Sequence, residues 1–371
     1  MKRIFSWLNE SKYISPLSPA CKMCANGSKI VLLITGLCSS NCFYCPLSLK
    51  KLGTDRIFVD EWELNDEKDT EKLILEANFI EATGAGITGG DPLIVWKRTK
   101  EYISFLKDYF GSDFHIHLYT SGIKNGDFID QLVDVGLDEI RFHPLPNFWE
   151  KMNSNPIVKS VKRSLKTDVD VAIEIPVIPN MEKEIFLLIK WAEKMGIKWI
   201  NLNELEFSET NADKLNKKGY MVKDDISAAV NGSQETANSV LNLISKEDFD
   251  IGVHYCSSSF KDGIQLKNRI IRRAKNIAKD YEIISNEGTI LKGIVYSQDR
   301  SLENIYKKLT QDFKIENKYI FINSKKRRIE IAAWILEDIS KKLKKQGLEC
   351  FLVEEYPTAD ALEVERIPLP L

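Results

Sequence analysis

Three cysteines stand within eight positions of this chain, and their spacing decides what chemistry they can do. Cys38, Cys42 and Cys45 lie in "TGLCSSNCFYCPLS", directly after the apolar run "KIVLLI". An odd group of cysteines leaves one thiol unpaired, and disulfides also need an oxidising compartment. Three thiolates in one short loop can instead ligate three irons of a cubane iron–sulfur cluster and leave the fourth iron open. The alternative is a zinc site that a distant fourth ligand completes.

Two further cysteines, Cys21 and Cys24, form a Cys-x-x-Cys pair in "SPACKMCANGSK". Such a pair is half of a zinc or iron site, a redox dithiol or two unligated thiols. A thioredoxin-like dithiol needs a helix that follows the pair, whereas residues 27–29 lead into a predicted strand. The sequence therefore favours a bound metal or an auxiliary cluster at Cys21 and Cys24.

Cys256 and His254 alternate along "GVHYC", so both side chains share one face of a predicted strand. We expect Cys256 to be the first extra ligand of the metal at Cys21 and Cys24, and His254 the second. A catalytic role as a hydrogen-atom donor is the other prediction for Cys256. The alternative is that its thiol is a small buried hydrophobic group, a description that Cys350 in "LECFLVEEY" fits best.

The composition predicts a soluble enzyme of two domains. At 371 residues the chain exceeds the usual size of one compact core, and 43% of its residues are hydrophobic. Its 52 basic and 54 acidic residues nearly balance, which argues against a protein that binds nucleic acid mainly through phosphates. No apolar segment approaches the roughly 20 residues that span a bilayer, and "MKRIFSWLNE" does not resemble a signal peptide. We therefore expect a cytoplasmic location and no membrane partner.

Short apolar runs alternate with helix-like patterns over most of the chain. "KIVLLITG" at 29–36 is typical of a buried parallel strand, and residues 69–84 follow with helical spacing. Five further strands are predicted, each followed by a helix-like stretch, at 85–90, 114–121, 138–144, 170–179 and 198–205. This order predicts an α/β fold, a partial (β/α)6 barrel for which 248–256 is a candidate seventh strand. Side chains at the carboxyl ends of such strands build the active site.

The pattern changes after residue 262. A basic helix-like stretch covers 265–281, and strands and helices then follow in the order β-α-β-α-β, with one long helical pattern at 329–347. This order predicts a small C-terminal α+β domain of ferredoxin-like type. The predicted division is an N-terminal segment at 1–28, a barrel domain at 29–262 and a C-terminal domain at 263–371.

The cysteine spacing, with aromatic Tyr44 just before the third cysteine, resembles the signature of the radical S-adenosylmethionine (radical SAM) superfamily. Further along, "TGGDP" resembles the second motif of that superfamily, Gly-Gly-Glu-Pro, and supplies Gly89, Gly90, Asp91 and Pro92 at the end of the second predicted strand. The resemblance covers roughly residues 27–210. The whole chain, with its "CKMC" and "HYCSSSFKD" segments, resembles an uncharacterised, largely archaeal branch related to pyruvate formate-lyase activating enzymes.

The resemblance implies two cofactors, a 4Fe–4S cluster on the three clustered cysteines and S-adenosylmethionine on the open iron. It implies cofactor contacts from Tyr44, near the adenine, and from the Gly89–Pro92 loop, whose glycines would allow close backbone approach. Asp91 replaces the usual Glu, is one methylene shorter, and would accept a hydrogen bond from the ammonium group of the cofactor. Polar side chains at later strand ends are further predicted cofactor contacts, with loop capping as the alternative for each: Ser121, His143, Glu174 and Asn203.

In the family, one electron from the cluster cleaves S-adenosylmethionine to methionine and a 5′-deoxyadenosyl radical. The leading hypothesis is an enzyme that abstracts hydrogen from a protein or a small metabolite, with a ferredoxin or flavodoxin as electron donor. The alternatives are a radical methyltransferase or another protein- or RNA-modifying enzyme, and a non-catalytic iron–sulfur or RNA-binding protein. Nucleic-acid binding is disfavoured because the C-terminal segment lacks the aromatic and basic pattern of RNA-binding sheets. If the substrate were a glycyl-radical protein, the C-terminal domain could dock it.

Overall fold

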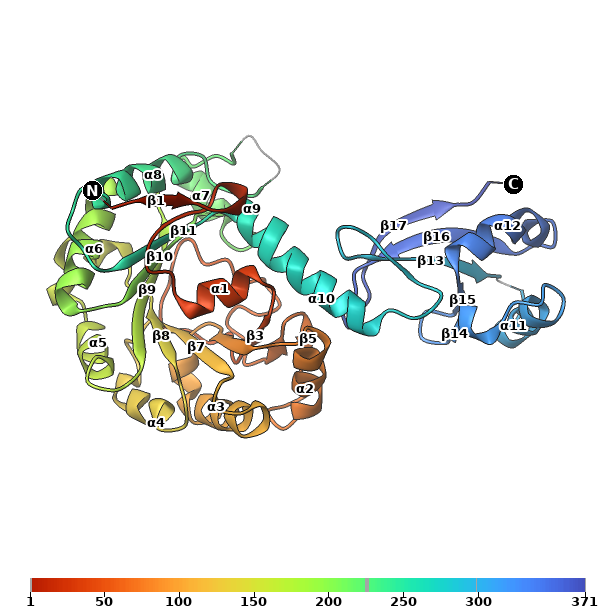
Figure 1. Cartoon of the computed structure of the whole chain (residues 1–371), viewed down its shortest axis with the longest axis horizontal. Coiled ribbons are helices and arrows are strands. Elements are labelled where there is room, and N and C mark those ends of the chain that lie inside the picture. The colour runs from red at the N-terminus through yellow and green to blue at the C-terminus, as the bar shows by residue number, and fades with distance from the viewer. Residues whose placement is uncertain (1, 224–226, 298, 371) are drawn as a thin grey trace. The chain divides into compact units, whose positions relative to one another are not determined.

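The computed structural model describes residues 2–223, 227–297 and 299–370. The chain divides into two compact units (Figure 1). The first comprises Met1–Asn78 and Ala82–Leu266, and the second comprises Phe79–Glu81 and Lys267–Leu371. The described strands form an 11-stranded sheet in the first unit and a 6-stranded sheet in the second.

Seven of the described strands in the first unit are parallel. They are β3 (Lys29–Leu33), β6 (Gly84–Thr88), β7 (His115–Thr120), β8 (Glu139–Phe142), β9 (Asp170–Val177), β10 (Trp199–Glu204) and β11 (Gly252–Cys256). Across the sheet they lie in chain order from β3 to β11, as successive βα units produce. The predicted α/β fold with a parallel sheet is therefore confirmed, and β11 is the candidate seventh strand.

Antiparallel hairpins occupy the two edges of this sheet. β1 (Ile4–Ser6) and β2 (Lys12–Ile14) continue it beyond β11, and β4 (Phe58–Val59) and β5 (Trp62–Glu63) continue it beyond β3. The described strands thus form an open sheet, and the ribbon shows that it is strongly curved (Figure 1). The N-terminal hairpin was not predicted, because strands of three residues carry too little alternation to be recognised.

Helices pack on the convex face of the curved sheet (Figure 1). They are α2 (Thr70–Phe79), α3 (Trp96–Phe110), α4 (Ile129–Val133), α5 (Val158–Ser164), α6 (Glu182–Met195) and α8 (Ser233–Ile244). In α6 the buried residues Ile185, Leu188, Ile189 and Ala192 recur at helical spacing, which explains why this stretch forms a helix with one face against the sheet. α7 (Ala212–Lys217) and α9 (Ser258–Phe260) follow β10 and β11.

The concave face of the sheet holds a helix that the sequence did not predict, α1 (Pro19–Ala25) (Figure 1). Ser18 caps it by accepting a hydrogen bond from Cys21 N (3.1 Å), and Pro19 occupies its first turn, where a missing N–H costs nothing. Gly27 follows the helix with φ +64°, a conformation that favours glycine. The Cys-x-x-Cys pair therefore lies on a helix inside the curve of the sheet.

The second unit begins with α10 (Lys267–Ile277), and its sheet is antiparallel throughout the described residues. Its elements are β12 (Ile283–Ile284), β13 (Ile290–Tyr296), α11 (Leu302–Gln311), β14 (Ile320–Asn323), β15 (Arg328–Ile331), α12 (Ala333–Lys344), β16 (Glu349–Glu355) and β17 (Glu363–Pro368). The strand order is β14-β15-β13-β16-β17, with β12 paired to β13. The helical pattern predicted at 329–347 is wrong at its start, because residues 328–331 pair with β14 as a hairpin strand.

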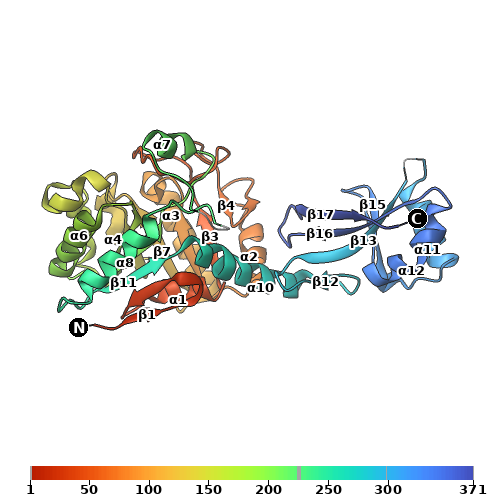
Figure 2. The ribbon, with the colours of Figure 1, turned by 90° about the horizontal axis from the view of Figure 1, so that it is seen from above.

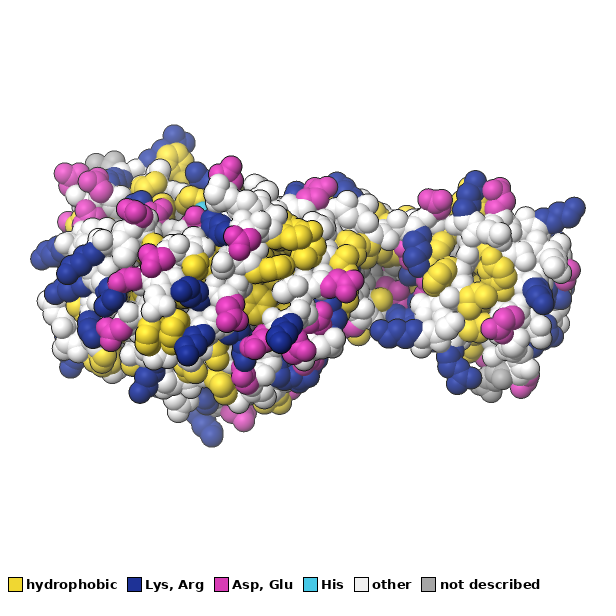
Figure 3. Space-filling model, turned by 90° about the horizontal axis from the view of Figure 1, so that it is seen from below, with side chains coloured by type: hydrophobic (Ala, Val, Ile, Leu, Met, Phe, Trp, Pro, Cys, Tyr) yellow, Lys and Arg dark blue, Asp and Glu magenta, His cyan; other side chains and the backbone are white. Residues whose placement is uncertain are grey.

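The surface carries charges of both signs. On the face in Figure 3, basic and acidic side chains are interspersed over the first unit and do not form a field of one sign. In the described part of the chain, no helix is long and apolar enough to cross a membrane.

Candidate functional site

The loop between β3 and β4 carries Cys38, Cys42 and Cys45 just after the carboxyl end of the first parallel strand. A backbone hydrogen bond from Gly36 N to Thr54 O (2.8 Å) closes the base of the loop. Cys38 is exposed, and the other two thiols are partly buried. The three predicted cluster ligands therefore share one loop at the strand end where an α/β active site is expected.

The three thiols lie close enough to affect one another electrostatically. Burial raises the pKa of Cys42 to about 11, and negative charge on Cys38 or Cys45 raises it as well. Burial is also the main reason why the pKa of Cys38 is raised. Ser40 N donates a hydrogen bond to Cys38 Sγ (3.3 Å), a contact of the kind that stabilises a cluster thiolate.

Tyr44 points from this loop toward the sheet and is only 6% exposed. Its hydroxyl lies 2.9 Å from His143 Nε2, just after β8, and His143 Nδ1 lies 2.8 Å from the backbone oxygen of Glu174. Because that carbonyl can only accept, Nδ1 carries the proton and Nε2 accepts from the Tyr44 hydroxyl. Burial lowers the pKa of His143, which keeps its ring neutral. His143 thus fixes the cysteine loop to the sheet through Tyr44.

A second attachment comes from the segment before α7. Asn211 Nδ2 donates to Tyr44 O (3.1 Å), and Thr210 Oγ1 donates to Cys45 O (3.1 Å). The Lys218 ammonium group lies 4.6 Å from the centre of the Phe43 ring. Figure 2 shows α7 beside the loop between β3 and β4, in agreement with these contacts. The loop is therefore held from two sides while its thiols stay partly accessible.

Gly89 and Gly90 lie where a side chain would collide with the backbone that leads into the cysteine loop. A Cβ at Gly89 would lie 2.2 Å from Thr35 O, and one at Gly90 would lie 2.2 Å from Leu37 O. Gly90 N donates to Thr35 O, and Asp91 N donates to Leu37 O, each at 2.8 Å. These glycines allow two strand-end loops of the chain to pack closely. Their close approach to S-adenosylmethionine stays a prediction.

Asp91 has its carboxylate inside the protein, with none of the residue exposed. Oδ1 accepts from Leu93 N (3.1 Å) and from Thr120 Oγ1 (2.7 Å), and Oδ2 accepts from Ser121 Oγ. Burial raises the pKa of Asp91, and these donors oppose the rise. Pro92 begins the 3-10 turn that Asp91 caps. The carboxylate that was predicted to receive an ammonium group is used here to join the ends of β6 and β7.

Glu174 and Asn203 lie on the concave face of the sheet. Glu174 Oε2 accepts from Arg141 Nη1 (2.6 Å), and its Oε1 accepts from Asn203 Nδ2 (2.7 Å). Asn203 Oδ1 in turn accepts from Asn201 Nδ2 (2.9 Å). The structure therefore brings these two predicted cofactor contacts together in a network with each other and with Arg141.

Arg141 is the centre of this network, and sequence reasoning missed it. Its Nε donates to Glu139 Oε1 (2.6 Å), and its Nη2 donates to Ser18 Oγ (2.8 Å), so it ties α1 to the sheet. A signal was available, since Glu139, Arg141 and His143 alternate in "EIRFH" and therefore share one face of β8. Charged residues at alternate positions of a buried parallel strand indicate a polar interior.

Lys29 is a second residue that was missed. It is 4% exposed, and its Nζ lies 2.9 Å from His115 Nδ1 and 2.5 Å from His117 Nδ1. Burial lowers the pKa of Lys29 to about 8, while negative charge on Cys24 would raise it. The interior of the first unit thus contains two buried cationic side chains beside α1.

The structure brings the predicted second group of metal ligands near one another without joining them. Cys21 and His254 line the same pocket, whereas Cys256 packs against Ala25 and accepts a hydrogen bond from Gln265 Nε2 (3.5 Å). Burial raises the pKa values of Cys24, to about 11, and of Cys256. In residues 2–223, 227–297 and 299–370, no three His, Cys, Asp or Glu side chains converge as the ligands of one ion do. The four-ligand site predicted from these residues is therefore not assembled.

Within the described residues, Cys38, Cys42 and Cys45 also do not converge as the ligands of a single ion. A cubane cluster holds its thiolates on separate iron atoms and so spaces them more widely than one ion does. Three partly accessible thiols on one braced loop, with an amide already directed at one sulfur, fit a 4Fe–4S cluster. The cysteine loop therefore fits a 4Fe–4S cluster. Cys21 and Cys24 fit a metal ion less well, because no third ligand converges on them among the described residues.

The profile of the radical SAM superfamily matches residues 32–192. A protein of Methanocaldococcus jannaschii, named as a "putative glycyl-radical enzyme activating enzyme", is 40% identical over 381 residues, which cover 100% of this chain and 96% of that protein. The chain belongs to the radical SAM superfamily.

This radical SAM chain is therefore an enzyme of S-adenosylmethionine-dependent radical chemistry, and its family implies a 4Fe–4S cluster and S-adenosylmethionine as cofactors. Residues 288–369 match a domain of unknown function, DUF8061. Among solved structures, SuiB of Streptococcus suis, free or bound to S-adenosylmethionine, has a TM-score of 0.43 at 12% identity. That alignment covers 62% of this chain and about half of SuiB, 49% for the free form.

Proposed function

We propose that this radical SAM enzyme holds a 4Fe–4S cluster on Cys38, Cys42 and Cys45, cleaves S-adenosylmethionine reductively and abstracts hydrogen from a protein or small-molecule substrate. When bound, the cluster would supply the electron that gives methionine and a 5′-deoxyadenosyl radical. The observation that carries the proposal is the braced cysteine loop, with Tyr44 bonded to His143 and the Gly89–Gly90 backbone packed under it.

The residues around the loop have distinct roles in this proposal. The hydrogen bond from Tyr44 to His143 orients the ring of Tyr44 beside the site of the adenine. Gly89, Gly90 and Pro92 present backbone to the methionyl end of S-adenosylmethionine. Asp91 and Ser121 act by holding that backbone in place, because their side chains are bonded to each other. Glu174 and Asn203 form the floor of the site, where Arg141 Nη1 and Asn203 Nδ2 each donate a hydrogen bond to the carboxylate of Glu174.

The substrate class is proposed from the name of the Methanocaldococcus jannaschii relative. A protein partner that carries the hydrogen to be removed is favoured over a small metabolite, and a ferredoxin or flavodoxin is the proposed electron donor. The strand order of the second unit, β14-β15-β13-β16 with two crossing helices, supports a ferredoxin-like domain, and we propose that it docks the partner. The curved parallel sheet of the first unit supports a partial barrel of radical SAM type.

Two site predictions are left without support from side-chain geometry. A second metal at Cys21 and Cys24 has no third ligand among the described residues. Cys256 as a hydrogen-atom donor stays a prediction, since its thiol is buried against Ala25 and Phe260. Methyl transfer is the alternative reaction, and it would be recognised by a methylated product in place of hydrogen abstraction.

The proposal is tested by product formation under strictly anaerobic conditions. Reconstituted protein, dithionite and S-adenosylmethionine should yield 5′-deoxyadenosine and methionine in equal amounts. The Cys38→Ala, Cys42→Ala, Cys45→Ala variant should yield less than about one hundredth of that, because the open iron is lost. Cys350→Ala is the matched control, because Cys350 is buried in the core of the second unit. Equal product from the triple variant would contradict the proposal.

A further inference from the structure

Five lysines lie on or beside the cysteine loop of the first unit. Two follow the cysteines in "SLKKLG", which contains no acidic residue, and three lie in or next to α7 in "ADKLNKKG", which contains one. We call these five residues the lysine patch: Lys50, Lys51, Lys214, Lys217 and Lys218. The chain as a whole has 52 basic and 54 acidic residues, so this local excess of positive charge is not a consequence of the composition.

α7 lies against the stretch of the loop that carries the thiols. The segment just before α7 donates hydrogen bonds to the backbone oxygens of Tyr44 and Cys45, each at 3.1 Å. The Lys218 ammonium group lies 4.6 Å from the centre of the Phe43 ring, and Figure 2 shows α7 beside the loop. The lysines of α7 therefore adjoin the cysteine loop.

The turn that carries the other two lysines also exposes two leucines. Lys50 Nζ and Lys51 Nζ lie 5.0 and 4.7 Å from the centre of the Phe58 ring. Leu49 is 63% exposed and Leu52 is 39% exposed. Exposed apolar side chains among charged ones provide contact area that a bound protein can cover. This turn therefore combines positive charge with apolar surface on the loop itself.

Acidic neighbours offset the charge only in part, because most of them have basic partners outside the lysine patch. These pairs are Asp55 with Arg98, Glu63 with Arg56, and Glu206 with Lys261. Glu63 Oε2 also lies 3.1 Å from Lys50 Nζ. Glu209 and Asp213 are exposed near the lysines of α7, and the five lysines outnumber them. The surface beside the cysteine loop thus keeps a net positive charge.

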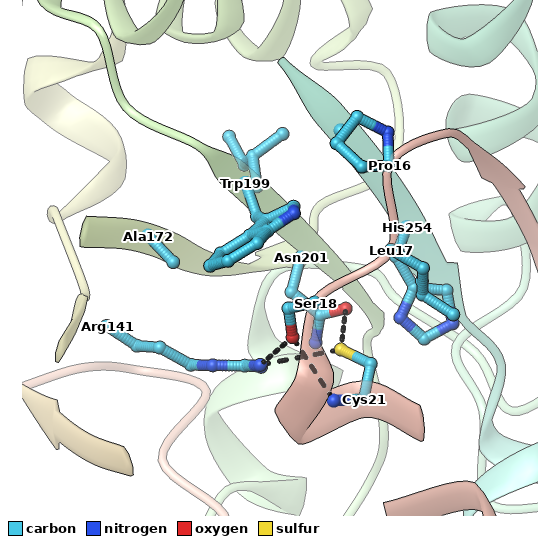
Figure 4. Close-up of a pocket in the computed structure, with 11 residues that line it drawn as sticks. Pro16, Leu17, Ser18, Cys21, Arg141, Ala172, Trp199, Asn201 and His254 are labelled. Carbon is cyan, nitrogen blue, oxygen red and sulfur yellow. Dashed lines mark hydrogen bonds between the residues drawn. The ribbon is translucent and has the colours of Figure 1, made fainter. Parts of the chain in front are cut away.

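The buried cations of the first unit do not add to this surface. Figure 4 shows Arg141 directed at Ser18 and Cys21 beside a small pocket in the interior, and Arg141 is 3% exposed. Lys29 is 4% exposed. The charge that a partner can reach beside the cysteine loop is therefore that of the lysine patch.

The proposed function needs an electron that reaches the cysteine loop from outside the protein, and Cys38 on that loop is exposed. We propose that the lysine patch docks an acidic one-electron carrier protein of the ferredoxin class. The carrier is oxidised by one electron, which enters the cluster on the loop, and no atom or proton passes between the two proteins. This inference rests on the proposed function, because the electron has no destination unless the loop holds a cluster.

Opposite charge suits a partner that binds briefly. Electron-transfer complexes bury little surface, and complementary charge raises the rate at which the two proteins meet in the correct orientation. Attraction between exposed charges is screened by salt. We therefore expect the complex to weaken as the ionic strength rises.

Crosslinking measures docking without S-adenosylmethionine. The full-length, cluster-loaded protein is mixed anaerobically with an oxidised acidic bacterial ferredoxin and a carbodiimide, which joins lysine amines to carboxylates that are in contact. Digestion and mass spectrometry then identify the lysines in each crosslink. We expect most crosslinks at the lysine patch and few at Lys190 and Lys194, two exposed lysines of α6. Added salt should remove the crosslinks at the lysine patch.

Charge reversal separates docking from cleavage of S-adenosylmethionine. The patch variant is Lys50→Glu, Lys217→Glu, and the control with the same change in charge is Lys190→Glu, Lys194→Glu. With reduced ferredoxin as the sole reductant at low salt, the patch variant should form 5′-deoxyadenosine about tenfold more slowly than the parent protein. The control should keep the parent rate. When excess dithionite reduces each protein beforehand, a single turnover should give the parent yield in both variants.

Iron content and thermal unfolding confirm that each variant is folded and loaded. Equal ferredoxin-driven rates in the patch variant and the parent, an equal loss in the control, or crosslinks spread evenly over the lysines of the chain would each overturn the proposal. A labelled single-stranded RNA that binds the parent and not the patch variant, with ferredoxin crosslinked elsewhere, would assign the surface to nucleic acid and overturn it as well. Absence of product with dithionite in the parent would contradict the proposed function, whereas the crosslinks report docking independently.

Discussion

Each unit buries a cluster of charged side chains, and the two clusters differ in how completely they are paired. The sheet cluster of the second unit comprises Lys292, Arg328, Glu330, Glu355 and their partners. Lys292 Nζ lies 3.1 Å from Glu355 Oε2, and Arg328 Nη2 lies 2.7 Å from Glu330 Oε1 and 2.5 Å from Glu355 Oε1. In the described residues, none of its buried side-chain nitrogen or oxygen atoms lacks a hydrogen-bond partner.

The interior cluster of the first unit, Arg141 with Glu139, Glu174 and the nearby histidines His117 and His254, is paired only in part. Arg141 bonds both carboxylates. His117 Nε2, Glu139 Oε2 and both ring nitrogens of His254 are buried without a hydrogen-bond partner. Unpaired buried polar atoms cost free energy, so they are retained where something other than stability requires them.

The difference indicates that the sheet cluster of the second unit stabilises the fold, whereas the interior cluster of the first unit lies at a site. A fully paired network fixes the packing of a sheet and needs nothing else. The unpaired donors and acceptors on β7, β8 and β11 are available to water, to substrate or to a change in protonation.

Removing a cation from the sheet cluster should have the largest effect on stability. Arg328→Met leaves Glu330 and Glu355 buried with too few partners, and it should lower the free energy of unfolding of the second unit by about 3–5 kcal/mol. Hydrogen exchange in peptides of β13 and β15 measures this loss of unfolding free energy. Lys308→Met, which breaks an exposed pair with Asp312, is the control and should leave exchange unchanged. A loss below about 1 kcal/mol for Arg328→Met would show that this network does not stabilise the fold.

Acid should destabilise the two units in different pH ranges. All four histidines of the chain lie in the first unit. Burial lowers the pKa of His254 from 6.5 to about 3, with Arg141 adding to the shift and Glu174 opposing it. The unfolded chain binds the proton first, so stability falls as pH drops from 6.5 toward 3, by about 1.4 kcal/mol per pH unit for this residue.

The carboxylates of the second unit respond only at lower pH. Glu330 has its pKa lowered from 4.5 to about 2, since Lys292 and Arg328 outweigh its burial. Its contribution is complete above pH 4.5 and is lost as pH falls toward 2. Between pH 6.5 and 4.5 we therefore expect hydrogen exchange, corrected for intrinsic rates, to accelerate in β11 and not in β13. Equal acceleration in both strands across that range would contradict the contrast.

A matched pair of aromatic substitutions should have the smallest effects and opposite signs. His254→Phe removes two unpaired nitrogens and should raise the free energy of unfolding by about 1 kcal/mol. Tyr281→Phe removes the hydroxyl that donates to Glu330 Oε2 (2.9 Å), and it should lower that free energy by about 1–2 kcal/mol. Urea unfolding of each variant gives both values. A stability loss in His254→Phe would indicate that His254 has a partner that its ring nitrogens need.

The parallel sheet could be predicted because its strands are buried on both faces. Continuous apolar runs such as 30–34 carry that signal alone, and Gly36 after this run marks the loop. The sequence predicts a helix that begins inside β15, because "RIEI" runs directly into the helical pattern of α12. Three or four residues are too few to distinguish the two-residue period of a strand from the 3.6-residue period of a helix. The sequence analysis does not predict α1, although Ser18 as an N-cap and Pro19 in the first turn are signals for the start of a helix.

The site could be predicted only where its residues are close in sequence. Cys38, Cys42 and Cys45 are readable from their spacing. The hydrogen bond between Tyr44 and His143 joins residues 99 positions apart, and the role of Arg141 depends on contacts with the start of α1 and with β9. The alternation in "EIRFH" is a signal that Arg141 shares a face with Glu139 and His143, but only the fold shows which thiol and which carboxylates it contacts.

The division between the two groups of cysteines is tested most directly by iron content. Anaerobically reconstituted protein, the Cys38→Ala, Cys42→Ala, Cys45→Ala variant and the Cys21→Ala, Cys24→Ala variant are compared for iron and sulfide per chain. We expect the loop variant to lose nearly all of its iron and its visible absorbance, and the interior variant to keep the parent values. Iron that stays in the loop variant, or that leaves with the interior pair, would contradict the assignment of the cluster to the loop.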